Sequence, residues 1–425
     1  MVAALFISFF LFVIINVPVA IAIALSSMAA IAIEGSIPFI IVVQKMFTSV
    51  DSFPFMAVPF FILAGLLMEH GGISRRLVDY ANSLVGGTYG GLALVAITAS
   101  MFFGAISGSA AATVAAIGTI LIPAMIEKGY EKSYATAVQA SAGTLGVMIP
   151  PSIPLIVYGV LSEVSVGALF IGGLLPGIIV GASLMLVARR LAKKKGYGTN
   201  EKPGYKKKSA SFQDAFFALL MPVIILGGIY GGYFTPTEAA VIAVVYGFIV
   251  GFFIYKELKI NSLGNILVSA VVSTAVIMFI IATASVFGWI LASEQVPRLI
   301  AELILSLTEN PIIILALINV LLLLLGTFLE TTAAIIIMAP VFVPVVTQIG
   351  IDPLHFGIVM VVNLAVGMVT PPLGVCLFVG CSIADVSLED ITRAILPFII
   401  IMIIDIAVIT YIPAVSTLLP RLTGM

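Results

Sequence analysis

Residues 143–159 read GTLGVMIPPSIPLIVYG, and residues 364–380 read LAVGMVTPPLGVCLFVG. At a shift of 221 positions the pair Pro150-Pro151 falls on the pair Pro371-Pro372, with a glycine four residues before each. Two adjacent prolines remove backbone donors and clash with the preceding turn, so each pair breaks a helix. One proline would explain a simple kink, but two pairs at one repeat position favour a functional break.

The repeat extends backwards from these pairs, because a stretch rich in Gly, Ser, Thr and Pro precedes each one. We predict helical hairpins at 104–126 and 326–348, followed by broken helices at 134–160 and 355–382. Secondary transporters are often built from two repeats of opposite topology, with the binding site at their interface. The sequence therefore favours two inverted repeats.

Composition places this repeat in a membrane. The chain is 61% hydrophobic and 9% charged, with a mean hydropathy of +1.26, whereas soluble proteins carry roughly 25% charged residues. A helix needs about 20 residues to cross the hydrocarbon core. We predict an all-α polytopic membrane protein whose further spanning segments are 3–33, 54–69, 87–103, 164–188, 214–233, 236–255, 265–293, 312–328 and 394–418.

A basic stretch separates the two repeats. Nine of the 19 basic residues fall between Arg189 and Lys208. Because cytoplasmic loops of membrane proteins are enriched in Lys and Arg, we predict that 189–213 is a cytoplasmic loop between a first repeat at 1–188 and a second at 214–425. The alternative is a patch that binds nucleic acid or phospholipid.

No motif indicates an enzyme. The sequence has no nucleotide-binding phosphate loop and no hydrolase or metalloprotease motif. Its two cysteines, Cys376 and Cys381, and its two histidines, His70 and His355, have spacings that fit neither a disulfide nor a metal site. We predict no cofactor, so the energy for transport must come from an ion gradient or another subunit.

The hairpins and broken helices supply oxygen atoms. Hydroxyls and freed carbonyls suit a hard cation such as Na⁺, although Ser and Thr also pack ordinary membrane helices. The predicted cation-binding residues, in two sites, are Ser107, Ser109, Thr144, Gly146, Gly326, Glu330, Thr331, Gly367 and Thr370. The predicted substrate-binding residues are Ser107, Gly108, Thr113, Thr332 and Asn363.

Charged residues inside apolar segments need separate interpretation, since an intramembrane charge usually faces a cavity. Glu330 is predicted to bind a cation, to carry a proton, or only to cap the helix that starts at Thr331. Asp405 is expected to pair within the helix bundle. Arg76 and Arg298 lie on amphipathic stretches and are expected at the membrane interface.

Five motifs together resemble the large membrane subunit of tripartite ATP-independent periplasmic (TRAP) transporters, over nearly the whole chain. They are VPFFILAGLLMEHGGISRRLVDYANSLVGG (58–87), FFGAISGSAAATVAAIGTILIPAM (102–125), GVMIPPSIPLIVYG (146–159), YGGYFTPTEAA (230–240) and GMVTPPLGVCLFVG (367–380).

The resemblance implies a bacterial inner-membrane complex with a small four-helix membrane subunit and a soluble periplasmic binding protein. It also implies Na⁺-coupled import of organic acids such as C4-dicarboxylates or sialic acid. A transport domain holding the hairpins would move like an elevator against a scaffold domain made of the first helices of each half. The small subunit would be a separate polypeptide, and no nucleic acid is involved.

Three other functions remain open at this point. A stand-alone Na⁺-coupled organic anion symporter would need no binding protein. An H⁺-coupled symporter would depend on Glu330. A structural or energy-converting subunit would need a chain of mid-membrane charges, which the sequence lacks. The sequence does not identify the organic acid.

Overall fold

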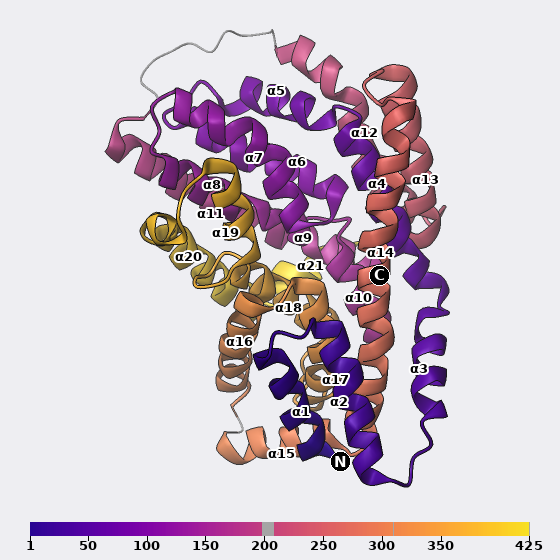
Figure 1. The fold of residues 1–425 in the computed structure, drawn as a ribbon. Coiled ribbons are helices and arrows are strands. Elements are labelled where there is room, and N and C mark those ends of the chain that lie inside the picture. Colours follow the sequence, from indigo (N-terminus) through magenta and orange to yellow (C-terminus); the bar gives the residue numbers. More distant parts are fainter. Residues whose placement is uncertain (198–207, 309, 425) are drawn as a thin grey trace.

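The computed structural model describes residues 1–197, 208–308 and 310–424, and all regular secondary structure in these ranges is helical (Figure 1). The helices are α1 (Val2–Ile14), α2 (Val19–Glu34), α3 (Ile40–Val50), η1 (Phe53–Met56), α4 (Ala57–His70), α5 (Ile73–Val85), α6 (Gly91–Ser107), α7 (Ala110–Glu127), α8 (Lys132–Gly143), α9 (Leu145–Met148), α10 (Ile153–Leu161), α11 (Val166–Lys195), α12 (Lys208–Tyr230), α13 (Pro236–Ile249), η2 (Val250–Ile254), α14 (Ile260–Ser293), α15 (Val296–Leu307), α16 (Pro311–Phe328), α17 (Thr331–Gln348), α18 (Pro353–Gly367), α19 (Val375–Ala384), α20 (Leu388–Tyr411) and α21 (Ala414–Leu422).

The second half of the chain repeats the helices of the first. Shifted by 221 positions, α7 (110–127) coincides with α17 (331–348), and α11 overlaps α20 over most of its length. The short amphipathic helix α5 likewise falls on α15. The repeat seen at the proline pairs is therefore a repeat of secondary structure along most of the chain.

The turns that lead into α11 and α20 also correspond. Glu163-Val164-Ser165 precedes α11, and Asp385-Val386-Ser387 precedes α20. Both acidic residues have positive φ angles, 55° and 50°, and both serines cap the following helix by accepting a backbone N–H. Serine is a favoured N-cap because its hydroxyl accepts one of the helix's unpaired N–H groups.

The proline pairs break their helices as predicted. Pro150-Pro151 lies between α9 and α10, Pro371-Pro372 lies between α18 and α19, and both peptide bonds are cis. Ser152 restarts the helix after the first pair by accepting the Leu155 N–H. Each break therefore leaves two half-helices whose ends face the same short loop.

The hairpins differ from prediction in where they begin. α6 continues to Ser107, so the predicted segment 87–103 forms the first arm of a hairpin whose second arm is α7. In the second half, α16 runs to Phe328 and is followed directly in the sequence by α17. α6 and α7 pack along one another, whereas α16 packs chiefly on α18. The prediction was wrong because Gly104 and Gly326 are tolerated inside helices and do not start the turns.

The apolar run 3–33 was predicted as one helix and is two, because Asn16 adopts a positive φ of 64° and Pro18 cannot continue α1. The separate helix α3 was not predicted. The predicted loop 189–213 is also shorter, since α11 extends to Lys195 and α12 starts at Lys208. Lys202, Lys206 and Lys207 lie outside the described residues.

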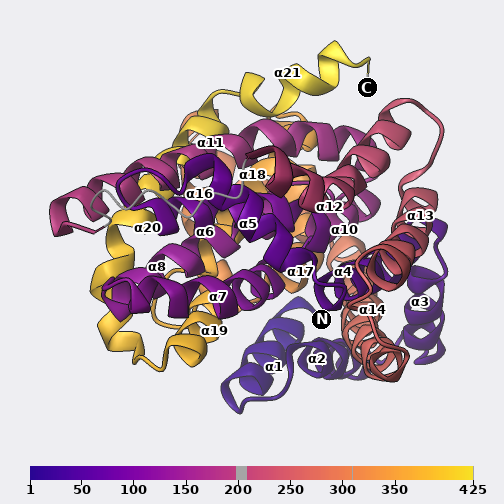
Figure 2. The same cartoon turned by 90° about the horizontal axis from the view of Figure 1, so that it is seen from above.

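Helices from both halves share one core. α4 packs on α13, and α14 packs on α2, α3 and α4. In the view from above, α21 lies at the edge opposite α1 and α2 (Figure 2). Ten described helices or helix pairs are long and apolar enough to cross a membrane. Many aliphatic side chains on them are exposed, for example Val271 and Val223, as expected for a surface that faces lipid.

The start of the basic stretch is held against the turn between α7 and α8. The rings of Tyr130 and Tyr197 stack with centroids 4.6 Å apart, and the Tyr134 hydroxyl donates to the Ala188 carbonyl over 2.8 Å. The Lys195 ammonium donates a hydrogen bond to the Glu131 carboxylate. This hydrogen bond holds the pKa of the Glu131 carboxyl below its usual range.

Candidate functional site

The tip of the first hairpin gathers three oxygen atoms. α6 ends at Ser107, Gly108 takes a left-handed φ of 61° that needs no Cβ, and Ser109 caps α7. The hydroxyls of Ser107 and Thr113 lie 3.0 Å apart, and Thr113 donates to the Ser109 carbonyl over 2.7 Å. Ser107 and Thr113 are buried.

The first broken helix touches this tip through Gly146. A Cβ at Gly146 would lie 2.4 Å from Thr113 Oγ1 and 2.5 Å from the Ser109 carbonyl oxygen, so only glycine permits the contact. Beyond the break, the Ile153 N–H donates to the Gly108 carbonyl over 3.4 Å. The structure therefore brings together five predicted residues: Ser107, Gly108, Ser109, Thr113 and Gly146.

Thr144 does not belong to this cluster. Its hydroxyl donates to the Ser141 carbonyl over 2.7 Å and lies 4.0 Å from the Met402 sulfur on α20. The prediction rested on the position of Thr144 on the broken helix opposite the hairpin. Its helical phase directs the side chain away from the hairpin tip, toward α20.

The second hairpin tip is built around a carboxylate. Glu330 caps α17, and one of its oxygens accepts the N–H groups of Thr332 and Ala333 over 2.8 and 3.2 Å. The other accepts the Thr332 hydroxyl over 3.0 Å. The expectation that Glu330 caps this helix is confirmed. At the repeat shift of 221 it stands where Ser109 stands in the first half.

The two halves share a glycine contact but differ in their hydroxyls. A Cβ at Gly367 would lie 2.5 Å from the Gly326 backbone, and one at Gly104 would lie 2.8 Å from Gly146. The Thr331 hydroxyl lies 3.0 Å from the Met368 sulfur. Thr370, which lies just beyond the end of α18, instead donates to the Val366 carbonyl on that helix, over 2.9 Å. Among its described residues, the second tip therefore gathers its oxygens around the Glu330 carboxylate and forms no cluster of uncharged oxygens like that of the first tip.

Asn363 lies in a separate polar network. Its amide donates to Asn319 Oδ1 over 3.0 Å and to the Val359 carbonyl over 2.8 Å. Asn319 in turn donates to the Thr410 hydroxyl over 3.0 Å. Asn319 is nine residues before the end of α16, so this network lies roughly 13 Å from the second tip.

Sequence reasoning missed two residues at the first tip. Gln139 on α8 donates to the Ser100 hydroxyl over 3.3 Å and to the Thr113 carbonyl over 3.4 Å, and so holds both arms of the hairpin. Ser152 donates to the Val147 carbonyl over 2.6 Å across the proline pair. The single glutamine of α8, and a serine directly after Pro-Pro, were the available signals.

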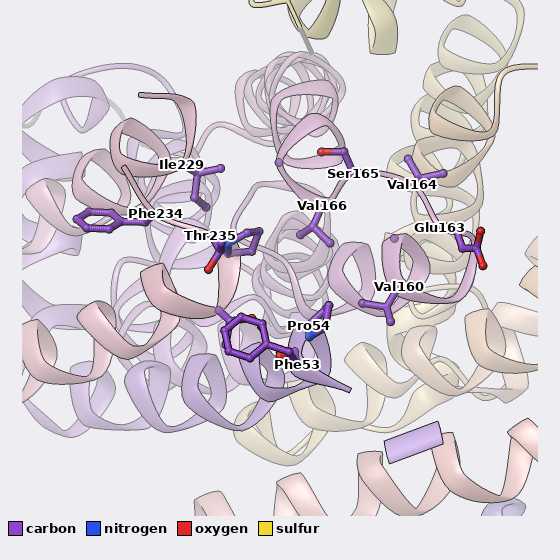
Figure 3. A pocket seen from close by; sticks show the side chains of 14 residues that line it. Phe53, Pro54, Val160, Glu163, Val164, Ser165, Val166, Ile229, Phe234 and Thr235 are labelled. Atoms are coloured by element: carbon purple, nitrogen blue, oxygen red, sulfur yellow. Dashed lines mark hydrogen bonds between the residues drawn. The ribbon is translucent and has the colours of Figure 1, made fainter. Parts of the chain in front are cut away.

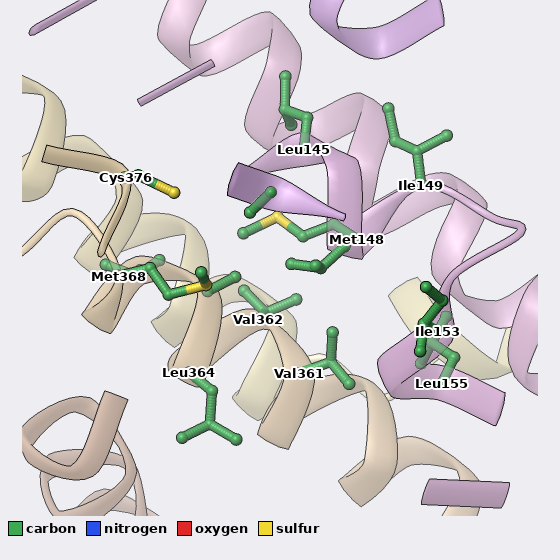
Figure 4. Packing of buried hydrophobic residues seen from close by; sticks show 14 of the residues in the cluster. Leu145, Met148, Ile149, Ile153, Leu155, Val361, Val362, Leu364, Met368 and Cys376 are labelled. Carbon is green, nitrogen blue, oxygen red and sulfur yellow. The ribbon is translucent and has the colours of Figure 1, made fainter. Parts of the chain in front are cut away.

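Apolar side chains fill the space between the two broken helices. Leu145 and Met148 from the first half face Val361, Val362 and Met368 from the second (Figure 4). The two breaks are therefore parts of one packed core.

Two further charged residues that the sequence analysis singled out have structural partners. Ser183 on α11 donates to the buried Asp405 on α20, which confirms the expected pairing within the bundle. Arg76 stacks on the Tyr255 ring at 3.8 Å and pairs with Glu257 over 2.6 Å. In the part of the chain that the structure describes, no three His, Cys, Asp or Glu side chains come close enough to hold a metal ion.

Hairpins that meet broken helices inside a polytopic membrane protein are typical of secondary transporters. The family described as "Tripartite ATP-independent periplasmic transporter, DctM component" matches residues 6–415. The chain belongs to this family and is a large permease component of the bacterial inner membrane.

Curated relatives agree with this assignment. The isethionate TRAP transporter permease protein DctMQ of Oleidesulfovibrio alaskensis is 48% identical over 96% of this chain, which spans 64% of that relative's length. The C4-dicarboxylate large permease DctM of Pseudomonas aeruginosa is 43% identical, with 90% and 89% of the two chains covered. The sialic acid large permease SiaM of Vibrio cholerae is 39% identical, with 96% and 95% covered.

Solved structures share the fold at low sequence identity. The Alcanivorax borkumensis YdaH transporter superposes with a TM-score of 0.61 at 18% identity, covering 90% of this chain and 89% of that one. Neisseria gonorrhoeae MtrF gives 0.57 at 13% identity, covering 87% and 83%. At these identities the likeness concerns the fold alone.

Proposed function

We propose that this permease imports an organic acid together with Na⁺, and that Na⁺ binds where the first hairpin tip meets the first broken helix. The observation that carries the proposal is the cluster of Ser107 Oγ, Thr113 Oγ1 and the Ser109 carbonyl oxygen against Gly146. All three oxygens are uncharged, which suits Na⁺, whereas proton coupling needs a titratable group in the path.

The same tip suits a carboxylate. α7 begins at Ala110 and α10 begins at Ile153, and the Ile153 N–H already reaches Gly108 at the hairpin tip. Helix N-termini attract anions because the helix dipole places a partial positive charge there. In our proposal the substrate's acidic group binds at these N-termini, and bound Na⁺ offsets its charge.

The relatives' printed names supply the candidate substrates, which are isethionate, C4-dicarboxylates and sialic acid. We propose that a periplasmic binding protein delivers the substrate and that a small four-helix membrane subunit completes the complex. The elevator movement expected from the family would carry the hairpins and broken helices past the first helices of each half.

The test is uptake of labelled isethionate, succinate and sialic acid into proteoliposomes that hold this chain and its small subunit. Uptake of one of them should require both an inward Na⁺ gradient and the cognate binding protein. Uptake that ignores the binding protein would contradict the tripartite part and favour a stand-alone symporter. Uptake driven by a pH gradient without Na⁺ would contradict the coupling.

A further inference from the structure

A cavity of about 530 Å³ lies where three segments of the chain meet (Figure 3). These segments are η1, the turn from α10 into α11, and the turn from α12 into α13. α10 has nine residues and rises by about 1.5 Å per residue, so the cavity lies roughly 12 Å beyond the Pro150-Pro151 break. It is therefore separate from the hairpin site.

The walls of the cavity are mostly apolar. Val160 and Val166 form one side, and Phe234 lies on the other (Figure 3). The Thr237 hydroxyl donates to the Phe53 carbonyl over 3.2 Å, which joins α13 to η1. Glu163 is the one charged side chain among the described lining residues, and no Lys, Arg or His lines the cavity there.

Aromatic side chains at the cavity are exposed. Phe53 lines the cavity and is 55% exposed, and nearby Tyr233 is 80% exposed. Exposed aromatic side chains are typical of the membrane interface.

We propose that this cavity binds a hydrocarbon chain whose polar end carries no net negative charge. Its volume falls within the roughly 300–1,000 Å³ of ordinary small-molecule sites, which are likewise mostly apolar. The Glu163 carboxylate at the rim repels an anionic end and attracts a cationic one. The cavity is therefore not a second site for the transported organic acid.

A bound chain would also slow transport, a consequence that rests on the proposed function. The turn from α10 into α11 follows the first broken helix, which the elevator mechanism assigns to the moving part. Phe53 and Phe234 belong to the first helices of the two halves, assigned to the scaffold. A chain seated between them contacts both parts and opposes their relative movement.

Photolabelling of the full chain in nanodiscs tests the binding. Dodecylamine, dodecanol and dodecanoate, each with a diazirine on the chain, serve as probes, together with a phosphatidylcholine that carries the same chain. The amine and the alcohol should label peptides within 159–167 and 229–237 at least fivefold more than dodecanoate. Labelling by the phosphatidylcholine probe alone would identify a bilayer lipid as the occupant. Labelling by the single-chain probes alone would identify a soluble amphiphile.

Three variants decide whether the labelled place is the cavity. Val160→Trp fills it and should abolish labelling of both peptides, whereas Val245→Trp, on the lipid-facing side of α13 where Val245 is 53% exposed, should leave labelling unchanged. Glu163→Gln alters only an exposed carboxylate and should raise dodecanoate labelling to the level of the alcohol. Equal labelling in Val160→Trp, or no response to Glu163→Gln, would overturn the proposal.

Uptake measured in parallel separates this proposal from the proposed function. Dodecylamine should inhibit Na⁺-driven uptake by wild type and not by Val160→Trp. Equal inhibition of both would overturn the link between cavity and transport. Intact labelling in a chain that shows no Na⁺-driven uptake would support the cavity site and contradict the proposed function.

Discussion

The hydroxyls of Ser107 and Thr113 lie 3.0 Å apart at the first hairpin tip, which makes them the direct test of the cation site. Losing one ligand of about 1 kcal/mol corresponds to about a fivefold change in an equilibrium constant. Ser107→Ala and Thr113→Ala should each raise the Na⁺ concentration for half-maximal uptake about fivefold, and Thr113→Ser should restore it.

The matched control is Thr144→Ala, because that hydroxyl bonds to Ser141 within its own segment. Its Na⁺ dependence should stay within twofold of wild type. If Thr144→Ala shifts the Na⁺ dependence as strongly as Thr113→Ala does, the cation is not held by the tip oxygens.

Glu330 is the charged counterpart of Ser109, and its contacts are those of a helix cap. Glu330→Gln keeps a carbonyl oxygen that can accept the same N–H groups, so uptake should remain Na⁺-dependent and within threefold of wild type. Glu330→Ala removes the cap and should lower the stability by about 1 kcal/mol, measured as a lower unfolding midpoint. Loss of coupling in Glu330→Gln at every Na⁺ level would instead assign Glu330 to a proton path.

At the residue scale, the sequence predicts site residues that are close together in the chain better than site residues that are brought together by packing. Ser107, Gly108 and Ser109 lie on one tight turn, so any hairpin there gathers them. Thr144 and Asn363 were assigned because they lie on the broken helices, whereas the direction of a helical side chain depends on the neighbouring helices. Those neighbours are α20 for Thr144 and α16 for Asn363.

Among the elements, the crossing of each hairpin with its broken helix depends on a glycine. A Cβ at Gly146 or Gly367 would lie within 2.5 Å of the opposing backbone. Gly146→Ala and Gly367→Ala should therefore each cost about 1–3 kcal/mol as overpacking, seen as a lower thermal midpoint of the purified protein. Na⁺-driven uptake should fall together with the thermal midpoint.

Gly227→Ala on α12 provides the comparison, because nothing lies within 4 Å of the added Cβ. There the substitution should be neutral or stabilising by up to about 1 kcal/mol, the ordinary preference of helices for alanine. A Gly146→Ala variant as stable as Gly227→Ala would mean that the hairpin and the broken helix do not cross this closely.

Helices and helix breaks were predicted well where the local sequence marks them, as at both proline pairs and in α11, α12 and α14. Helix boundaries were predicted poorly where the local sequence preference and the packing of the whole fold compete. The run 3–33 is apolar throughout, so only Asn16 and Pro18 mark the division into α1 and α2. The first arm of each hairpin continues through a glycine, because packing against a neighbouring glycine compensates for its low helix propensity.

In the whole molecule, the cavity was beyond prediction because three segments distant in sequence form it. Its position also makes the movement testable. A bifunctional thiol reagent across Val160→Cys and Phe234→Cys, in a background with Cys376 and Cys381 replaced by serine, would join the first broken helix to the α12–α13 turn. If the two parts move past one another in every cycle, this link should abolish more than nine-tenths of Na⁺-driven uptake, and reduction should restore it.

The same reagent across Phe53→Cys and Thr237→Cys links two residues already joined by a hydrogen bond between η1 and α13. Both belong to the first helices of their halves, so that link should leave uptake nearly unchanged. An equal loss of uptake in both cross-linked pairs would mean that the reagent stiffens the chain in general. Full uptake in the cross-linked 160–234 pair would place the movement elsewhere, because a covalent bridge cannot follow a part that travels across the membrane.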